Sequence, residues 1–344
     1  MRSSKFKETD TAILSSNFGE KSEVRRVKRE ATTPSSHFAL RTSNLLDITV
    51  LAGGPGAERE VSLQSGRAVY DALRRLGHRV ELCDIGPTDL SALDHPADFV
   101  FVALHGEFGE DGALQAELDA RGLRYSGSGA AASRLAMDKV ESKRCFEQAG
   151  VPTPSYELVS RSGLMGLAAR AKLPVVVKPV SSGSSVDTSI VHTPKTLEEA
   201  AGAVVARYGT ALVEQYIAGP ELTVGVLGEE ALPVCEIRTP REFYDYQAKY
   251  VDDNTQYLFD LDLPSDLLKR VQRLSLAAHR AVGCRVFSRV DCMVDALSME
   301  PYFLEVNTIP GFTSHSLLPK AAARIGLTFD CLCQRIVELS MNNE

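Results

Sequence analysis

Oxygen-bearing side chains lie on two otherwise apolar segments in the last third of the chain. Asp291 belongs to SRVDCMVD, and Glu305 and Asn307 belong to PYFLEVNTIPG. Side chains two residues apart on a strand share a face, so Glu305 and Asn307 should point together while Val306 points into the core. Two carboxylates and an amide suit Mg²⁺, whose other ligands are water and nucleotide phosphates. Solvent-facing edge-strand residues would give the same pattern, but Arg289, two positions before Asp291, favours a site.

A second candidate site begins where the apolar segment LPVVVKP reaches Lys178. The loop that follows has four serines around Gly183. Small side chains let backbone N–H groups approach phosphate oxygens, and the lysine ammonium offsets their negative charge. The Walker pattern GxxxxGK(S/T) is absent, and an ordinary flexible loop is the alternative interpretation. The lysine at the strand end favours a phosphate site.

Two more polar residues follow expected strands in the first half of the chain. Glu58 comes after the turn GGPGA and begins a helical segment. Its carboxylate could hold a substrate ammonium group, or could simply complement the positive end of the helix dipole. His105 lies in the loop HGEFGEDG, where it could contact a substrate or face solvent.

Composition limits the classes of function. The 344 residues are 44% hydrophobic and 24% charged, and the chain lacks an apolar run near the ~20 residues that a membrane span needs. A net charge of −7 argues against general nucleic-acid binding, which depends on clustered Lys and Arg. Seven scattered cysteines without a CxxC pair predict a reduced, cytoplasmic compartment.

The elements that must position these residues follow from hydrophobic periodicity. A strand at 47–54, a helix at 58–76 and a strand at 78–85 form a βαβ unit, and 98–106 adds a third strand. These elements predict a small doubly wound parallel sheet. Later strands are expected near 174–179, 211–217, 222–238, 286–295 and 300–306, and helices near 112–121, 128–149, 196–207, 264–282 and 316–340.

Changes in composition divide the chain into four parts. Residues 1–44 are polar and basic, with no sustained apolar period, and are expected to be a disordered extension. The two prolines of AGVPTPSY mark a boundary between a domain at 45–150 and a central subdomain at 151–225. A C-terminal subdomain at 226–344 contains the segment 239–263, whose length and lack of periodicity predict a lid.

Eight segments together resemble the ATP-grasp ligases and, within them, the D-alanine-D-alanine ligases. They are GGPGAEREVSLQSG, ALHGEFGEDGALQ, GSGAAASRLAMDK, VVVKPVSSGSSV, VEQYIAGPELTV, FYDYQAKY, FSRVDCM and FLEVNTIPGFTSHSLLP. They occur in family order and cover residues 47–340. The resemblance implies an α/β ATP-grasp fold preceded by the small parallel-sheet domain, a homodimer, and a role in making peptidoglycan precursors.

The resemblance also implies where the first substrate and ATP bind. Glu58 is similar to the residue that holds the amino group of the first D-alanine, Ser184 to the residue that links it to Tyr250 of the lid, and His105 to a substrate contact. The positions similar to ATP-binding residues are Lys139 and Lys178 for the phosphates, Lys249 for the γ-phosphate, Ser185 and Val186 for the loop over the phosphates, and Glu214 and Glu221 for adenine and ribose.

The remaining implied roles concern the metal and the second substrate. The matched ligands of two Mg²⁺ or Mn²⁺ ions are Asp291, Glu305 and Asn307. Arg289 and the backbone N–H of Gly311 resemble the groups that stabilise the tetrahedral intermediate. Ser316 and Leu317 resemble the contacts to the carboxylate of the second D-alanine.

Two departures from the family pattern raise questions. Asp187 stands where the family usually has Gly, and a carboxylate near the triphosphate would repel it unless the side chain points outward. The leader of about 44 residues has no implied role. Two other functions stay open: a D-alanine-D-lactate ligase, against which Tyr250 argues, and a catalytically silent nucleotide-binding homologue.

Overall fold

The structure is a computed structural model that describes residues 45–240 and 254–342. Lys249 and Tyr250 of the predicted lid and the N-terminal residues 1–44 fall outside these ranges. Within the described part of the chain, no helix has the length and apolar character that crossing a membrane requires.

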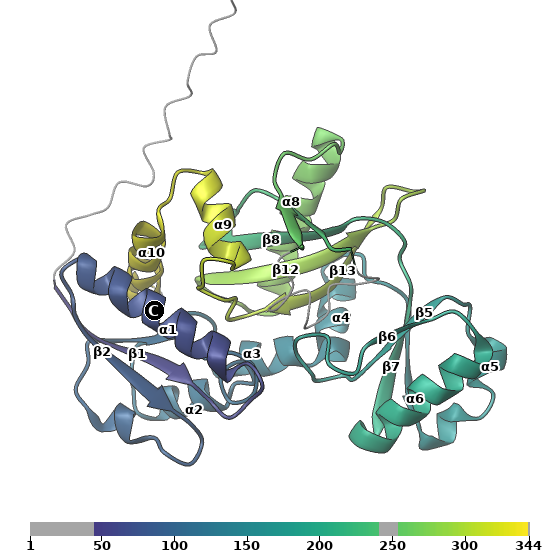
Figure 1. The fold of residues 1–344 in the computed structure, drawn as a ribbon, viewed down its shortest axis with the longest axis horizontal. Coiled ribbons are helices and arrows are strands. Elements are labelled where there is room, and N and C mark those ends of the chain that lie inside the picture. The colour runs from purple at the N-terminus through teal and green to yellow at the C-terminus, as the bar shows by residue number, and fades with distance from the viewer. Residues whose placement is uncertain (1–44, 241–253, 343–344) are drawn as a thin grey trace, which may run out of the picture. The chain divides into compact units, whose positions relative to one another are not determined.

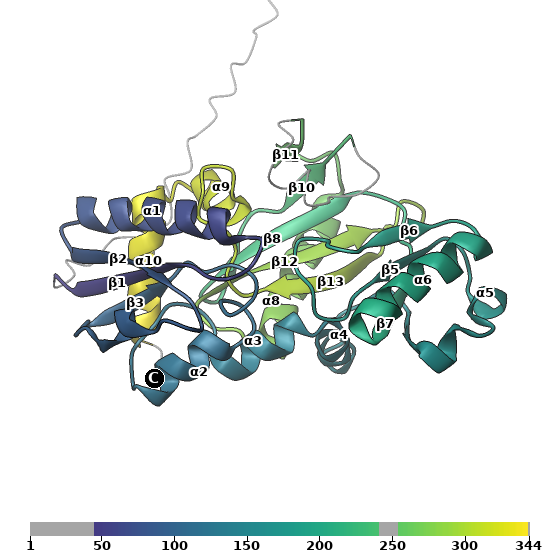
Figure 2. The ribbon, with the colours of Figure 1, turned by 60° about the horizontal axis from the view of Figure 1, so that its bottom comes forward.

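The first domain is built on three parallel strands in the order β2-β1-β3. Their bounds are Asp47–Gly53 for β1, Arg79–Ile85 for β2 and Phe99–Val102 for β3. Helix α1 (Arg59–Arg75) connects β1 to β2 and packs on both strands, as Figures 1 and 2 show. This arrangement confirms the predicted α/β class and the parallel N-terminal sheet, although β3 is shorter than the expected strand at 98–106.

Short helices lead from this domain to the central sheet. They are α2 (Ala113–Ala120), α3 (Ala130–Met137) and α4 (Lys139–Gln148), whereas the 3₁₀ helix η2 (Ser91–Asp94) lies earlier, between β2 and β3. Asp138 ends α3 and begins α4, because its side chain accepts hydrogen bonds from the backbone N–H groups of Val140 and Glu141. The boundary between the two helices therefore places Lys139 at the start of α4.

The central sheet has four antiparallel strands in the order β4-β7-β5-β6. The strands are β4 (Tyr156–Ser160), β5 (Val175–Lys178), β6 (Ser189–Val191) and β7 (Thr210–Gln215). Helix α6 (Pro194–Tyr208) starts with a capping box at Thr193 and packs on this sheet with η3 (Arg161–Leu164) and α5 (Leu167–Arg170) (Figure 1). Lys178 therefore ends a strand, as predicted.

The third sheet has six strands: five lie in the order β11-β10-β8-β12-β13, and β9 pairs with β8. The strands are β8 (Glu221–Leu227), β9 (Glu230–Ala231), β10 (Cys235–Arg238), β11 (Gln256–Leu258), β12 (Phe287–Val294) and β13 (Pro301–Asn307). Helices α3, α4 and α8 (Ser265–Ala281) pack against it. Residue 225, the predicted limit of the central subdomain, lies inside β8; the division into domains stays a prediction.

The C-terminal segment differs from the single helix expected at 316–340. It forms two helices, α9 (Leu317–Arg324) and α10 (Phe329–Asn342). Gly326 between them has φ +80°, a left-handed conformation that ends a helix and that glycine adopts readily. Helix α10 packs against α1, so the chain returns to the first domain (Figure 1).

Candidate active site

The residues of β12 and β13 alternate between the two faces of the six-stranded sheet. Val290 and Val306 belong to the core that these strands share with α4 and α8. Asp291 pairs directly with Glu305, and Arg289 is paired with Asn307. Direct partners in an antiparallel pair project from the same face. The sheet thus brings the four polar side chains together on the face turned away from that core.

A β-bulge adjusts this arrangement at Glu305. Asp291 pairs with Glu305 but Cys292 pairs with Phe303, so Leu304 is an extra residue on β13. As a result Leu304 and Glu305, although adjacent, both line the cavity described next, while Phe303 stays fully buried in the core. Strict alternation would have placed Phe303 on the same face as Glu305.

A cavity of about 370 Å³ lies between the four-stranded and the six-stranded sheets. One part of its wall is apolar and is formed by Val176, Ile190, Ile217, Ile237, Met293 and Leu304. Another part is charged and includes Lys139, Lys178, Glu214, Glu221, Asp291 and Glu305. Such a wall can take a flat apolar ring and a polyanion in one ligand.

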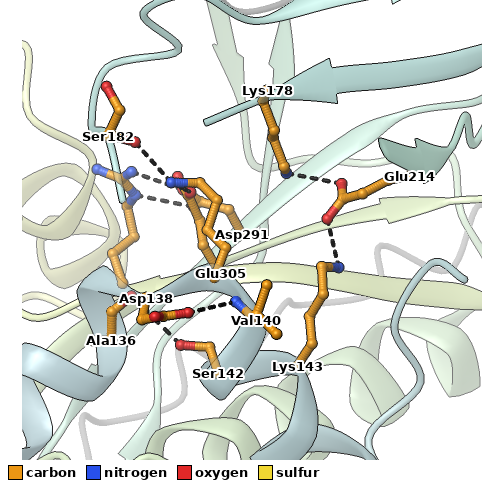
Figure 3. Close-up of polar contacts among 12 residues, drawn as sticks. Ala136, Asp138, Val140, Ser142, Lys143, Lys178, Ser182, Glu214, Asp291 and Glu305 are labelled. Atoms are coloured by element: carbon orange, nitrogen blue, oxygen red, sulfur yellow. Dashed lines mark hydrogen bonds and ion pairs between the residues drawn. The ribbon is translucent and has the colours of Figure 1, made fainter. Parts of the chain in front are cut away.

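Two lysines, Lys143 and Lys178, approach the carboxylate of Glu214 at the charged end (Figure 3). Lys178 Nζ lies 2.8 Å from Glu214 Oε2, and Lys143 Nζ lies 2.9 Å from Glu214 Oε1. Lys139 Nζ donates to the carbonyl of Ser182 at 2.7 Å and lies 3.5 Å from Glu305 Oε2. Lys139 and Lys178 line the cavity and are the ammonium groups that an anionic ligand could contact at this end.

Burial and charge act in opposite directions on these groups. Burial lowers the pKa of Lys139 and of Lys143, because desolvation disfavours an ammonium ion. Burial alone would raise the pKa of Glu214, but Lys178 and Lys143 together hold it below its ordinary value. Glu214 is therefore a buried anion. Glu214 lines the cavity, and its contact with adenine or ribose, which the resemblance implies, stays a prediction.

Asp291 has two partners inside the site. Its Oδ1 accepts a hydrogen bond of 2.6 Å from Thr223 Oγ1, and Arg289 donates to both carboxylate oxygens, at 3.0 and 2.7 Å. Asn307 Oδ1 accepts from the backbone N–H of Ile309 at 3.0 Å. These contacts orient oxygen ligands on one face of the sheet.

The oxygen set fits a hard divalent cation. Asp291, Glu305 and Asn307 supply only oxygen, the donor that Mg²⁺ and Mn²⁺ prefer. In the described ranges, no three His, Cys, Asp or Glu residues form a group that could hold a metal. The two carboxylates thus need the amide of Asn307, together with water and phosphate oxygens, to complete a coordination shell.

The serine-rich loop at 181–188 connects the cavity to the first domain. Ser182, Ser185 and Thr188 line the cavity. Ser184 donates a hydrogen bond to the carboxylate of Glu58, which precedes α1. Val186 is held in a turn by a 3.2 Å bond from its N–H to the carbonyl of Gly183. The loop thus brings together Glu58 and Ser184, which are 126 positions apart.

The side chain of Asp187 points away from the cavity wall. Its Oδ2 accepts hydrogen bonds from Arg207 at 2.7 Å and from the Tyr208 hydroxyl at 2.6 Å, both at the end of α6. This orientation answers the concern that its charge would repel a triphosphate, because Arg207 offsets the carboxylate.

His105 is buried rather than solvent-facing. Its Nδ1 lies 3.0 Å from the carbonyl of Ile309, which can only accept, so Nδ1 carries the proton. Its Nε2 lies 3.0 Å from Ser65 Oγ and accepts from it. Burial lowers the pKa of His105, and the neutral ring links the first domain to the loop after β13.

The loop after β13 presents the last predicted residues. A Cβ at Gly311 would lie 2.5 Å from Ser316 Oγ, so a larger residue here would require the Ser316 side chain to move. Ser316 Oγ accepts from the backbone N–H of Thr313 at 2.9 Å, and Ser316 precedes α9. The side chain of Leu317 is buried against Cys235 and Ile237, which leaves its backbone as the group able to reach a ligand.

Sequence reasoning missed three residues of the site. Lys143 and Thr223 contact Glu214 and Asp291, as described above. Glu110 accepts from the N–H of Gly106 at 2.7 Å, and its Oε1 is buried without a hydrogen-bond partner in the described structure. Burial, and then the charge of Glu58, raises the pKa of Glu110 to about 8, so it is neutral at pH 7.

Known proteins are similar to this chain in sequence and fold. Residues 145–338 match the family model described as "D-ala D-ala ligase C-terminus". The D-alanine-D-alanine ligase of Gloeobacter violaceus is 45% identical over 301 residues, covering 86% of this chain and 99% of that protein. The chain belongs to the D-alanine-D-alanine ligase family.

Two further members illustrate the similarity. The D-alanine-D-alanine ligase of Bordetella avium is 44% identical over 296 residues, which are 84% of this chain and 93% of that protein. A crystal structure of the Bacillus anthracis D-alanine-D-alanine ligase complexed with ATP superposes with a TM-score of 0.72 and 33% identity, covering 86% of this chain and 97% of that one. The family assignment therefore extends over the N-terminal domain as well as the ATP-grasp part.

Proposed function

We propose that this protein joins two D-alanine molecules at the expense of ATP, in the synthesis of a peptidoglycan precursor. The observation that carries the proposal is the cavity between the two antiparallel sheets. Its apolar wall suits adenine, and Lys139, Lys178, Asp291 and Glu305 line its charged end. Membership of the ligase family supports D-alanine as the substrate.

The first step is proposed to activate one D-alanine. Glu58, hydrogen-bonded by Ser184, would hold the substrate ammonium group, so that the carboxylate is aimed towards the cavity. A carboxylate oxygen attacks the γ-phosphorus of ATP, the bond to the β–γ bridging oxygen breaks, and ADP leaves. The product is D-alanyl phosphate.

The second step would form the peptide bond. The amine of the second D-alanine attacks the acyl carbon, loses a proton, and expels inorganic phosphate from the tetrahedral intermediate. Arg289 and the backbone N–H of Gly311 are proposed to stabilise the developing oxyanion, because fixed donors cost little reorganisation. The N-terminal end of α9, with Ser316 before it, would attract the second carboxylate.

Charge neutralisation is the main task of the remaining residues. Lys139 and Lys178 would offset the repulsion between the substrate carboxylate and the triphosphate. Asp291, Glu305 and Asn307 would hold two Mg²⁺ or Mn²⁺ ions, which when bound neutralise phosphate charge and orient the γ-phosphate. Lys249 and Tyr250, outside the described residues, are proposed to complete the site from the lid.

The setting of the enzyme is also a proposal. We infer a homodimer from the family resemblance alone. A cytoplasmic location is supported by the seven cysteines, which are all free.

The test is an assay of the purified protein with ATP, Mg²⁺ and one amino acid at a time, with both phosphate and dipeptide measured. D-alanine should release one phosphate per dipeptide, whereas L-alanine should release none. A mixture of D-alanine and D-lactate should still yield mainly the dipeptide. A depsipeptide as main product would replace this proposal with the lactate ligase, and no phosphate with any acceptor would favour a silent nucleotide-binding protein.

A further inference from the structure

We propose that Asp187 is a positioning residue that anchors the serine-rich loop to α6 and thereby holds the loop ready for nucleotide. The inference rests on the proposed function in one respect, namely that the ligand of the cavity is ATP. Asp187 stands where the resemblance has Gly, and its carboxylate makes contacts that Gly could not make.

The loop needs an anchor because its backbone is unfavourable for its own residues. Ser184, Ser185 and Asp187 all have positive φ, at +53°, +56° and +54°. Non-glycine residues visit this left-handed region at a cost, and they stay there only where surrounding contacts hold them. Asp tolerates the conformation better than most residues, which explains why it can replace Gly here.

Contacts hold the loop at three points along its length. Lys139 bonds the carbonyl of Ser182, and Glu58 bonds the hydroxyl of Ser184. The third point is Asp187, which accepts two hydrogen bonds from consecutive residues of α6, Arg207 and Tyr208. The first two contacts involve groups that a substrate or phosphate would engage, whereas the third lies outside the cavity and can persist throughout the reaction.

The geometry of the third contact is well defined. The Arg207 guanidinium also lies over the ring of Tyr208, with Cζ 5.2 Å from the ring centroid, so the two donors support each other. The hydrogen bond to Asp187 raises the pKa of Tyr208, which keeps the hydroxyl protonated and donating. A glycine at 187 would relieve the backbone but would leave α6 unconnected to the loop.

The expected consequence is a change in the population of the binding-competent loop. If the anchor is removed, only a fraction of molecules present Ser182 and Ser185 correctly, and the apparent affinity falls by that fraction. At saturating ATP the bound state is restored, so kcat should be nearly unaffected. Loss of one hydrogen bond and one partly exposed ion pair should raise the KM for ATP by about threefold to tenfold.

The experiment compares Asp187→Ala, Asp187→Asn and Asp187→Gly with the wild type. Hydrogen exchange of the amides at 181–188 is measured without nucleotide, and KM and kcat are measured with ATP. Glu199→Ala is the matched control, because it removes the ion pair with Lys195, at 3.9 Å, on the same helix. Binding of a fluorescent ATP analogue to each variant gives a readout that needs no turnover.

We expect faster exchange at 181–188 and a higher KM for ATP in Asp187→Ala, with kcat within about twofold. Asp187→Asn should be intermediate, because the amide oxygen can accept from Tyr208 but lacks the ion pair with Arg207. Glu199→Ala should match the wild type.

Three results would overturn the inference. Unchanged exchange in Asp187→Ala would mean that the contact does not hold the loop, and a lower KM in Asp187→Gly would mean that the carboxylate repels nucleotide. A lower kcat at unchanged KM would place the effect in the chemical step. If the wild type has no ligase activity, the proposed function fails. Hydrogen exchange at 181–188 and binding of the fluorescent ATP analogue would still test whether Asp187 anchors the loop.

Discussion

Asp291 and Asp187 have the same kinds of partner and differ in their surroundings. Each accepts hydrogen bonds from one arginine and one hydroxyl: Arg289 and Thr223 for Asp291, and Arg207 and Tyr208 for Asp187. The side chain of Asp291 is 8% exposed, whereas that of Asp187 is 36% exposed. A comparison of the two aspartates therefore shows how burial changes the contribution of equivalent partners.

Burial changes what each partner contributes. Near the surface, water replaces a lost partner, so an ion pair is worth little and its use lies in orientation. Inside the cavity wall, the loss of the arginine leaves a largely buried carboxylate without its counter-charge. A carboxylate, a guanidinium and a hydroxyl therefore have different roles at the two sites. At Asp187 they anchor a loop, whereas at Asp291 the arginine is needed to compensate a buried negative charge.

The largest expected difference follows from removing the two arginines. Arg289→Met should lower the free energy of unfolding by about 3–5 kcal/mol, because Asp291 keeps a buried, unpaired charge. Arg207→Met should lower it by no more than about 1 kcal/mol. Urea unfolding of the ligand-free protein measures the free energy of unfolding of each variant. Equal losses in the two variants would contradict the proposed difference between the two aspartates.

A titratable group whose pKa is set mainly by burial sharpens the comparison. Burial lowers the pKa of His279 on α8 to about 4, and its Nδ1 lies 2.7 Å from Ser288 Oγ. Between pH 6.5 and pH 4 the unfolded chain binds a proton at His279 that the folded protein does not bind. The free energy of unfolding should therefore fall by about 3 kcal/mol as the pH is lowered over this range. The glutamine of His279→Gln does not titrate, so the free energy of unfolding of this variant should fall less over the same pH range. Parallel stability curves for the two proteins would contradict the account.

The smallest expected effect concerns the two hydroxyls. Thr223→Val should weaken Mn²⁺ binding in the presence of a non-hydrolysable ATP analogue by about tenfold, because Asp291 loses the group that orients it. Thr223→Ser should restore binding. Tyr208→Phe, the matched change at the exposed aspartate, should leave Mn²⁺ affinity unchanged when the ATP analogue is saturating. Electron paramagnetic resonance of free Mn²⁺ measures all three, and a similar loss in Tyr208→Phe would remove the distinction.

Much of the fold and of the metal-binding face could be predicted because it depends on local periodicity. Alternation along the strand predicts that Glu305 and Asn307 share a face, and the βαβ pattern predicts the first sheet. Alternation could not predict the bulge at Leu304, since a bulge depends on pairing with a strand elsewhere in the chain.

The missed residues differ in how much signal the sequence offers. Lys143 follows Lys139 by four positions on α4, so one helical turn places both on the same face. Thr223 follows Glu221 by two positions on β8, which also predicts a shared face. The partners of Asp187 lie 20 and 21 positions away across a loop and a helix, and no local pattern predicts such a contact.

The transfer of a carboxylate oxygen to phosphate tests the central claim most directly. D-alanine labelled with ¹⁸O in its carboxylate is supplied with ATP and Mg²⁺, and the inorganic phosphate is analysed by mass spectrometry. An acyl phosphate intermediate predicts one ¹⁸O atom in the phosphate for each dipeptide formed. Unlabelled phosphate accompanying the dipeptide would contradict the mechanism proposed for this cavity.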